Sequence, residues 1–111
     1  MKVGDILKCS WGYEQTNIDF YEVVKATKAM ATVRKIAGRS WPEERYSAMS
    51  GFVVPCPGEF LEGWRAKEYR RKVNAPGTDY ESIKIEDYSR AFLLKPNEDG
   101  TYPKSYFSTY A

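Results

Sequence analysis

The segment SWGYEQTN, residues 10–17, combines two aromatic rings, a glycine and several polar side chains near the start of the chain. Gly12 can adopt a positive φ, and the polar residues after it can hydrogen-bond a turn, so the segment is typical of a structural corner between strands. Loops on a rigid β scaffold also carry binding residues, and aromatic rings beside amide groups suit a nucleobase or a peptide. The candidate binding residues of this segment are Trp11, Tyr13, Gln15 and Asn17.

The second candidate is the basic segment WRAKEYRRK, residues 64–72. It holds five cations against the single carboxylate of Glu68, in a chain whose net charge is only +2. Interleaved aromatic rings would let such a segment pair with phosphates and stack on bases. A charged edge strand that prevents aggregation explains the same pattern at least as well. The candidate binding residues of this segment are Trp64, Arg65, Tyr69, Arg70, Arg71 and Lys72.

The residue types needed for metal binding and acid–base catalysis are sparse. The chain has no histidine, which removes the commonest general acid–base group and the usual zinc ligand. Cys9 and Cys56 form no C-x-x-C motif and are expected to be free, buried thiols. The carboxylates between residues 79 and 87 are interpreted as surface and turn residues. We therefore predict no catalytic residue, no metal site and no cofactor.

The elements that must position these residues are short strands. Runs rich in β-branched and aromatic residues predict strands at 6–10, 18–26, 31–36, 51–57 and 67–73. The segment 37–51 is expected to be a loop, with room for one helical turn after Pro42, and prolines 55 and 57 are expected to close the strand before them. The aromatic C-terminal segment is expected to pack back onto the body of the protein.

The segment 82–96 begins as a clear alternation of apolar and polar residues. This alternation places Lys84 and Glu86 on one face of a strand and Asp87, with the isoleucines, on the other. It therefore separates Glu86 from Asp87 and argues against a shared carboxylate site.

With 111 residues, of which 15% are aromatic, the chain is predicted to be one domain, residues 1–111, of mostly β structure. We expect a small SH3-like or partly open β-barrel with at most one short helix. The alternative is an α+β roll with a short helix near residues 59–69. No stretch is apolar for long enough to be a signal peptide or a membrane span, so we expect a cytoplasmic protein with no membrane partner.

The stretches GDIL, SWGYEQTN, DFYEVV, TVR and RRKV resemble a group of short uncharacterised proteins carried by bacteriophages, prophages and mobile elements. The resemblance is closest from residue 3 to about residue 36, and looser through Val54, Arg71 and the C-terminal aromatic residues. It implies a biological setting rather than an activity, so no catalytic residue is carried over.

The function favoured by the sequence is a non-enzymatic binding module of phage or mobile-element origin that docks on a host protein or a defence component. The alternative is a small-barrel nucleic-acid-binding protein that uses the segment 64–72. An enzyme would need a pocket that joins Tyr13, Glu14 or Asp19 to Arg34 or Lys35. A structural subunit would need a self-complementary apolar patch and would form a homo-oligomer. The oligomeric state is left open.

Overall fold

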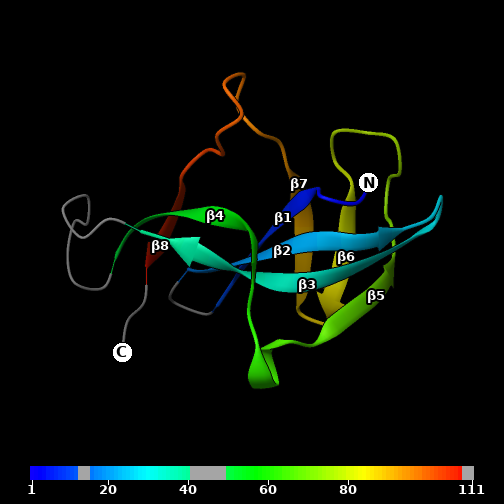
Figure 1. Cartoon of the computed structure of the whole chain (residues 1–111), viewed down its shortest axis with the longest axis horizontal. Coiled ribbons are helices and arrows are strands. Elements are labelled where there is room, and N and C mark those ends of the chain that lie inside the picture. Colours follow the sequence, from blue (N-terminus) through cyan, green and yellow to red (C-terminus); the bar gives the residue numbers. More distant parts are fainter. Residues whose placement is uncertain (13–15, 41–49, 109–111) are drawn as a thin grey trace.

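The computed structural model describes residues 1–12, 16–40 and 50–108, which form antiparallel strands and one single-turn 3-10 helix (Figure 1). The elements are β1 (Ile6–Trp11), β2 (Asn17–Ala26), β3 (Met30–Arg39), β4 (Ser50–Phe60), η2 (Gly63–Arg65), β5 (Glu68–Lys72), β6 (Ser82–Glu86), β7 (Ser89–Leu94) and β8 (Ser105–Ser108). The prediction of a mostly β chain is confirmed. The helix expected near residues 59–69 under the alternative fold is reduced to η2.

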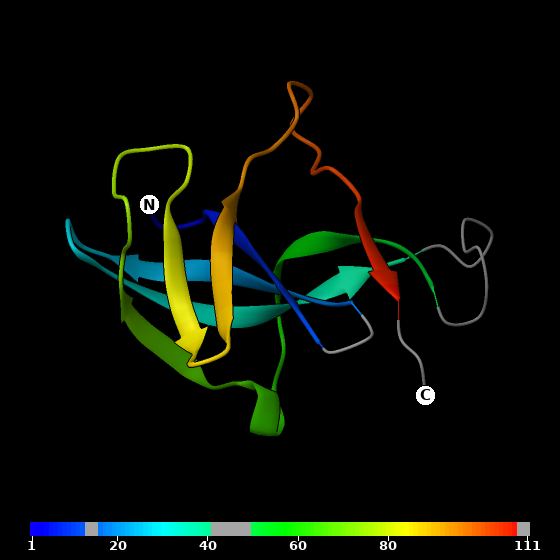
Figure 2. The ribbon, with the colours of Figure 1, turned by 180° about the vertical axis from the view of Figure 1, so that it is seen from behind.

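The strands belong to one sheet with the order β6-β7-β1-β2-β3-β4-β8, and β5 pairs with β3 beside this path. The sheet curls until β5 lies next to β6, where an isolated bridge joins Asn74 to Ser82. It does not close, because no ladder joins β5 to β6. Figures 1 and 2 show β5 and β6 on one side of the molecule and β4 and β8 on the other.

Strand β3 changes its partner along its length. Its first half pairs with β5, in a register that sets Val33 opposite Tyr69. Its last residues pair with β4, in a register that sets Gly38 opposite Pro55. A register shift also occurs within the β3–β4 ladder, between Ile36 and Gly38. Figure 1 shows β4 and β5 on opposite sides of the molecule.

Two clusters of buried side chains follow from this arrangement. Alternate residues of β1, β2 and β3 point to opposite faces. One face carries Leu7, Tyr21 and Val33 into the space enclosed by β5, β6 and β7. The other face carries Ile6, Phe20 and Ile36, and side chains from β4 and from residues before β8 cover them. This explains why the segment DFYEVV is apolar on both faces.

Several local expectations are confirmed and others are wrong. The hairpin between β2 and β3 forms, closed by the Thr27 amide donating to the Met30 carbonyl at 2.8 Å. The C-terminal segment packs back as expected, because β8 pairs with β4. Strand β4, however, does not end at the prolines. It continues to Phe60, with Pro55 opposite Gly38 and Pro57 within the irregular stretch before the pair of Ile36 with Phe60, where a missing N–H removes no regular ladder bond.

Both cysteines of the chain are free: Cys9 is buried and Cys56 is half-buried. Glu81, interpreted as a surface carboxylate, is instead buried and accepts a hydrogen bond at 2.6 Å from the amino group of Met1. Within the described residues, no helix has the length and apolar character that crossing a membrane requires.

Gly38 provides a test of the β3–β4 junction. A methyl group at this position would lie 2.8 Å from Cγ2 of Val53 and 3.3 Å from the Phe20 ring. We expect Gly38→Ala to lower the free energy of unfolding by about 1–3 kcal/mol, because the second buried cluster would be overpacked. Urea unfolding followed by tryptophan fluorescence measures this change.

The exposed substitution Lys28→Ala, in the turn between β2 and β3, is the control and should change stability by less than about 0.5 kcal/mol. An equally small change in Gly38→Ala would contradict the packing described for the junction.

Candidate functional site

The inner face of the sheet is the one that carries Leu7, Tyr21 and Val33 into the space enclosed by β5, β6 and β7. At one end this face is polar and hollow. Directly opposed residues of neighbouring strands lie on the same face, and the register sets Cys9 opposite Asp19 and Tyr21 opposite Lys35. The same face is fully apolar further along the strands, where Val23 lies opposite Val33. The inner face therefore changes from an apolar core to a polar hollow within two or three residues of each strand.

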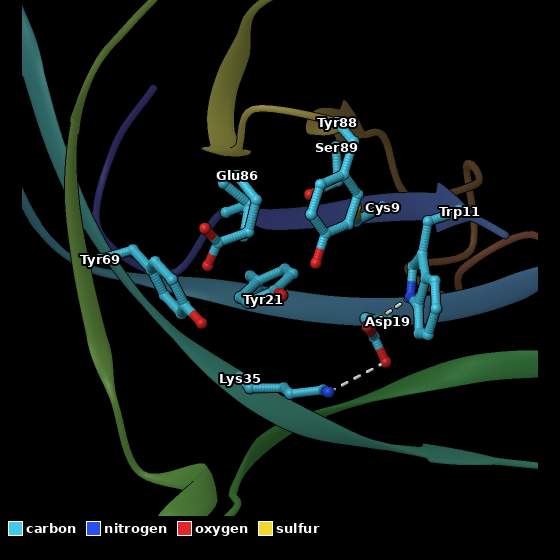
Figure 3. A pocket seen from close by; sticks show the side chains of 10 residues that line it. Cys9, Trp11, Asp19, Tyr21, Lys35, Tyr69, Glu86, Tyr88 and Ser89 are labelled. Carbon is cyan, nitrogen blue, oxygen red and sulfur yellow. Dashed lines mark hydrogen bonds and ion pairs between the residues drawn. The ribbon is translucent and has the colours of Figure 1, made fainter.

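We call this hollow the aromatic pocket. Its volume is about 160 Å³, and it lies between β5 and the turn that joins β6 to β7 (Figure 3). Its lining residues are Cys9, Trp11, Asp19, Tyr21, Lys35, Tyr69, Ile85, Glu86, Tyr88 and Ser89.

A chain of polar contacts fixes one wall of the aromatic pocket. The Trp11 indole Nε1–H donates a hydrogen bond to Asp19 Oδ2 at 2.7 Å. The other oxygen of Asp19, Oδ1, lies 3.1 Å from Lys35 Nζ. The indole ring is 40% exposed. It is therefore held in one orientation and still presents aromatic surface to solvent, which is the arrangement that a stacking platform needs.

The opposite wall is built from tyrosines. The rings of Tyr21 and Tyr69 meet edge to face, with their centroids 5.9 Å apart and an interplanar angle of 88°. Tyr21 is buried and forms the floor, whereas Tyr88 is 78% exposed and stands at the rim. Two cations flank Tyr69: Lys67 Nζ lies 4.8 Å and Arg71 Cζ 5.3 Å from the ring centroid.

The Cys9 thiol and the Tyr21 phenol of the aromatic pocket are held neutral rather than activated. Burial, and then the charge of Asp19, raise the pKa of the Cys9 thiol. The same two causes, in the same order, raise the pKa of the Tyr21 phenol. Both groups therefore keep their protons at neutral pH, where a protonated thiol is a poor nucleophile. The pocket offers hydrogen bonding and stacking surface rather than an activated nucleophile.

A second hollow, which we call the basic groove, lies on the other side of Arg71. Its volume is about 340 Å³, and no carboxylate is among its described lining residues. Its lining residues, from β5, β6, β7 and the segment after β5, are Arg71, Lys72, Val73, Asn74, Lys84 and Arg90. The register of β6 and β7 sets Lys84 directly opposite Arg90.

Arg71 connects the basic groove to the aromatic pocket. Its guanidinium stacks beside Tyr69 and donates to the carbonyl of Ile85 at 3.3 Å, across the gap between β5 and β6. A second bond, to the carbonyl of Arg70, holds the same group at 3.1 Å. Arg71 thus lines the basic groove and contacts Tyr69, which lines the aromatic pocket.

The structure brings together residues from both segments that the sequence singled out. Trp11 and Tyr69 line the aromatic pocket. Asn17 and Trp64 line two neighbouring hollows, of about 240 and 440 Å³, which share Asp19 with the pocket. The Nδ2 atom of Asn17 is buried and has no hydrogen-bond partner among the described residues.

The basic segment is divided by the alternation of β5. Arg71 lines the basic groove and contacts Tyr69 of the aromatic pocket, whereas Arg70 lies opposite Thr32 on the outer face of the sheet and lines neither hollow. Lys72 lines the basic groove, and Arg65 belongs to η2 rather than to a strand. The candidates Tyr13 and Gln15 lie outside the described residues.

Sequence analysis missed Glu86, Lys84 and Arg90. Strict alternation assigned Glu86 to the same face as Lys84, but a register shift between these two residues interrupts the ladder and brings Glu86 to the aromatic pocket. Lys84 and Arg90 meet only through cross-strand pairing, which a linear motif does not reveal. The sequence signal for these three residues is weak: the short connection between β6 and β7 indicates a tight hairpin, in which residues of the two strands lie opposite each other.

The chemistry available to the site is recognition by stacking, hydrogen bonds and charge. No group of three or more potential metal ligands occurs among the described residues. The structure does bring Asp19 to Lys35, the pair required by the enzyme hypothesis, and the two charges neutralise each other in an ion pair.

The raised pKa of Tyr21 predicts how stability depends on pH. The native state keeps the phenol proton at a pH where the unfolded chain loses it, so this contribution is complete below about pH 10 and is lost as the pH rises above it. We expect the unfolding free energy of Tyr21→Phe to fall less steeply above about pH 10, by up to about 1.4 kcal/mol per pH unit. Urea unfolding at several alkaline pH values measures the slopes.

Tyr80→Phe, which removes a hydroxyl from an exposed ring, is the matched control and should keep the wild-type slope. Equal slopes for the wild type and Tyr21→Phe would show that the phenol of Tyr21 is not desolvated in the native state.

Comparison of the chain with models of protein families, with curated proteins and with solved structures found no match. The resemblance to short phage and mobile-element proteins stays a prediction from the sequence. The functional argument therefore rests on the aromatic pocket and the basic groove.

Proposed function

We propose that the protein binds single-stranded nucleic acid, with phosphates in the basic groove and bases at the aromatic pocket. The observation that carries this proposal is the position of Arg71, which lines the basic groove and stacks beside Tyr69 of the aromatic pocket. Single-strand-binding proteins combine the same two features, a positive groove along the backbone and aromatic rings that stack bases.

The charge of the basic groove supports a polyanionic partner. Four cations from three strands line it, and one of them, Lys84, pairs at 3.2 Å with Asp87, which is 99% exposed. Such an exposed pair contributes little to stability and is readily exchanged for a phosphate. Arg71 needs little reordering on binding because two carbonyl oxygens already hold its guanidinium.

The aromatic pocket supports a single strand rather than a duplex. Its rings can stack only on bases whose faces are open, and bases within a duplex are already stacked on each other. Beyond the pocket, Trp64 is 87% exposed in a hollow that shares Asp19 and Lys35 with it. A strand leaving the pocket would therefore find a further aromatic ring on the same surface.

A protein partner, the function favoured by the sequence, is our second candidate, and a separate surface supports it. A hollow of about 520 Å³ lies between β4 and the segment 97–104, lined mainly by apolar groups that include Pro55, Pro57 and Tyr102. An SH3-like identity for the partly open sheet, and an origin in a phage or mobile element with a cytoplasmic location, remain part of this proposal.

The basic groove is tested by removing two of its cations. We expect Lys84→Ala combined with Arg90→Ala to weaken binding of a labelled oligothymidylate of about 15 nucleotides by about tenfold or more at low salt. The slope of log K against log salt should become shallower by about 1.4, because each lost phosphate contact removes about 0.7 for a single strand. Fluorescence anisotropy over a series of salt concentrations gives both quantities.

Lys25→Ala combined with Arg70→Ala is the matched control. It removes the same charge from the outer face, where both residues lie opposite Thr32, and should leave both quantities close to wild type. Wild-type binding that ignores ionic strength, or an equal loss in the control, would contradict the proposal. Absence of any oligonucleotide binding would leave the protein partner as the better candidate.

A further inference from the structure

The carboxylates of the aromatic pocket are not equivalent. Both oxygens of Asp19 are engaged, one by the Trp11 indole and the other by the Lys35 ammonium. The Glu86 carboxylate forms no ion pair or hydrogen bond with any of the described residues. Figure 3 shows it pointing from the β6–β7 turn towards Tyr69 and Tyr21. It is a half-buried acceptor whose two oxygens are available to a ligand.

A half-buried carboxylate selects a ligand that presents hydrogen-bond donors. A ligand with two parallel N–H groups satisfies both carboxylate oxygens. A ligand with one donor beside an acceptor satisfies only one oxygen, and its acceptor is repelled by the lone pairs of the other. The surrounding rings, of which Trp11 is fixed by its bond to Asp19, favour a flat ligand that can stack. The ligand is therefore a planar group with two adjacent donors on one edge.

Among the nucleobases, guanine meets this requirement. Its Watson–Crick edge carries the N1–H and N2–H donors side by side, with the O6 acceptor next to them. Adenine and cytosine offer one donor group beside a ring acceptor, and thymine or uracil offers one donor between two acceptors. These edges are open to proteins in single strands. The Lys35 ammonium, which has three donors, lines the same pocket and can serve the O6 acceptor.

We propose that the aromatic pocket binds one unpaired guanine, with Glu86 accepting from N1–H and N2–H. This inference rests on the single-strand binding proposed above and adds base specificity to it. The basic groove supplies affinity for any sequence, and Glu86 supplies the choice of base.

The first experiment compares oligothymidylates of about 12 nucleotides that carry one central G, A, C or T. We expect the wild type to bind the G strand about tenfold more tightly than the other three, as a bidentate base contact allows. In Glu86→Gln the advantage of G should vanish, because an amide presents one acceptor and one donor group to two donors. Binding of the all-thymidine strand should not weaken, because the lost carboxylate contributes no attraction to a polyanion.

Asp87→Asn is the matched control. It removes the neighbouring carboxylate, which is 99% exposed and lies outside the aromatic pocket, so the ratio between the G and T strands should be kept. Equal binding of all four strands by the wild type would overturn the guanine proposal and leave single-strand binding intact. Loss of the G advantage in Asp87→Asn would also overturn it, because a general charge effect would then be responsible.

A mononucleotide titration separates the two proposals if no strand binds. Guanosine and adenosine monophosphate are added while the indole N–H signal of Trp11 is followed by NMR, with Trp11→Phe to assign the signal. A shift with the guanine nucleotide alone would support the pocket and reject only the single-strand function. The absence of any shift would reject the guanine pocket as well.

Discussion

The change of partner along β3 is the constraint on which the rest of the structure depends. One edge of β3 pairs first with β5, from Met30 to Arg34, and then with β4, from Ile36 onwards, and the β3–β4 ladder shifts its register between Ile36 and Gly38. Gly38 lets Val53 and Phe20 approach the backbone at this point, where a Cβ atom would leave no room. The first half of β3 is thereby free to pair with β5, which sets Tyr69 and Arg71 on the inner face.

The two hollows follow from that inner face. At one end its residues are polar, and Asp19 joins the indole of Trp11 to Lys35. On the other side of Arg71, the β6–β7 hairpin adds two cations to those of β5. Stacking surface and positive charge thus come from six strands, β1, β2, β3, β5, β6 and β7, and the guanidinium of Arg71 contacts both.

The sequence predicted the strands well where alternation and turn residues are regular, as in 6–10, 18–26 and 67–73. It failed where tertiary pairing overrides local preference, because β4 passes through two prolines by using an irregular ladder. Trp11 and Tyr69 could be named from residue type, yet their meeting depends on long-range register. Glu86 could not be found, since a single register shift in a hairpin reverses which face a residue occupies.

The incomplete closure of the sheet contributes directly to the site. In a closed barrel, a regular ladder between β5 and β6 would occupy carbonyl groups such as that of Ile85 with backbone N–H donors. Here no such ladder forms, and the Ile85 carbonyl accepts from the Arg71 side chain instead. The Ile85 carbonyl, which a complete ladder would use for backbone pairing alone, therefore holds the Arg71 guanidinium between the aromatic pocket and the basic groove. Closing the gap would add backbone hydrogen bonds and would remove the acceptor that holds Arg71 beside Tyr69.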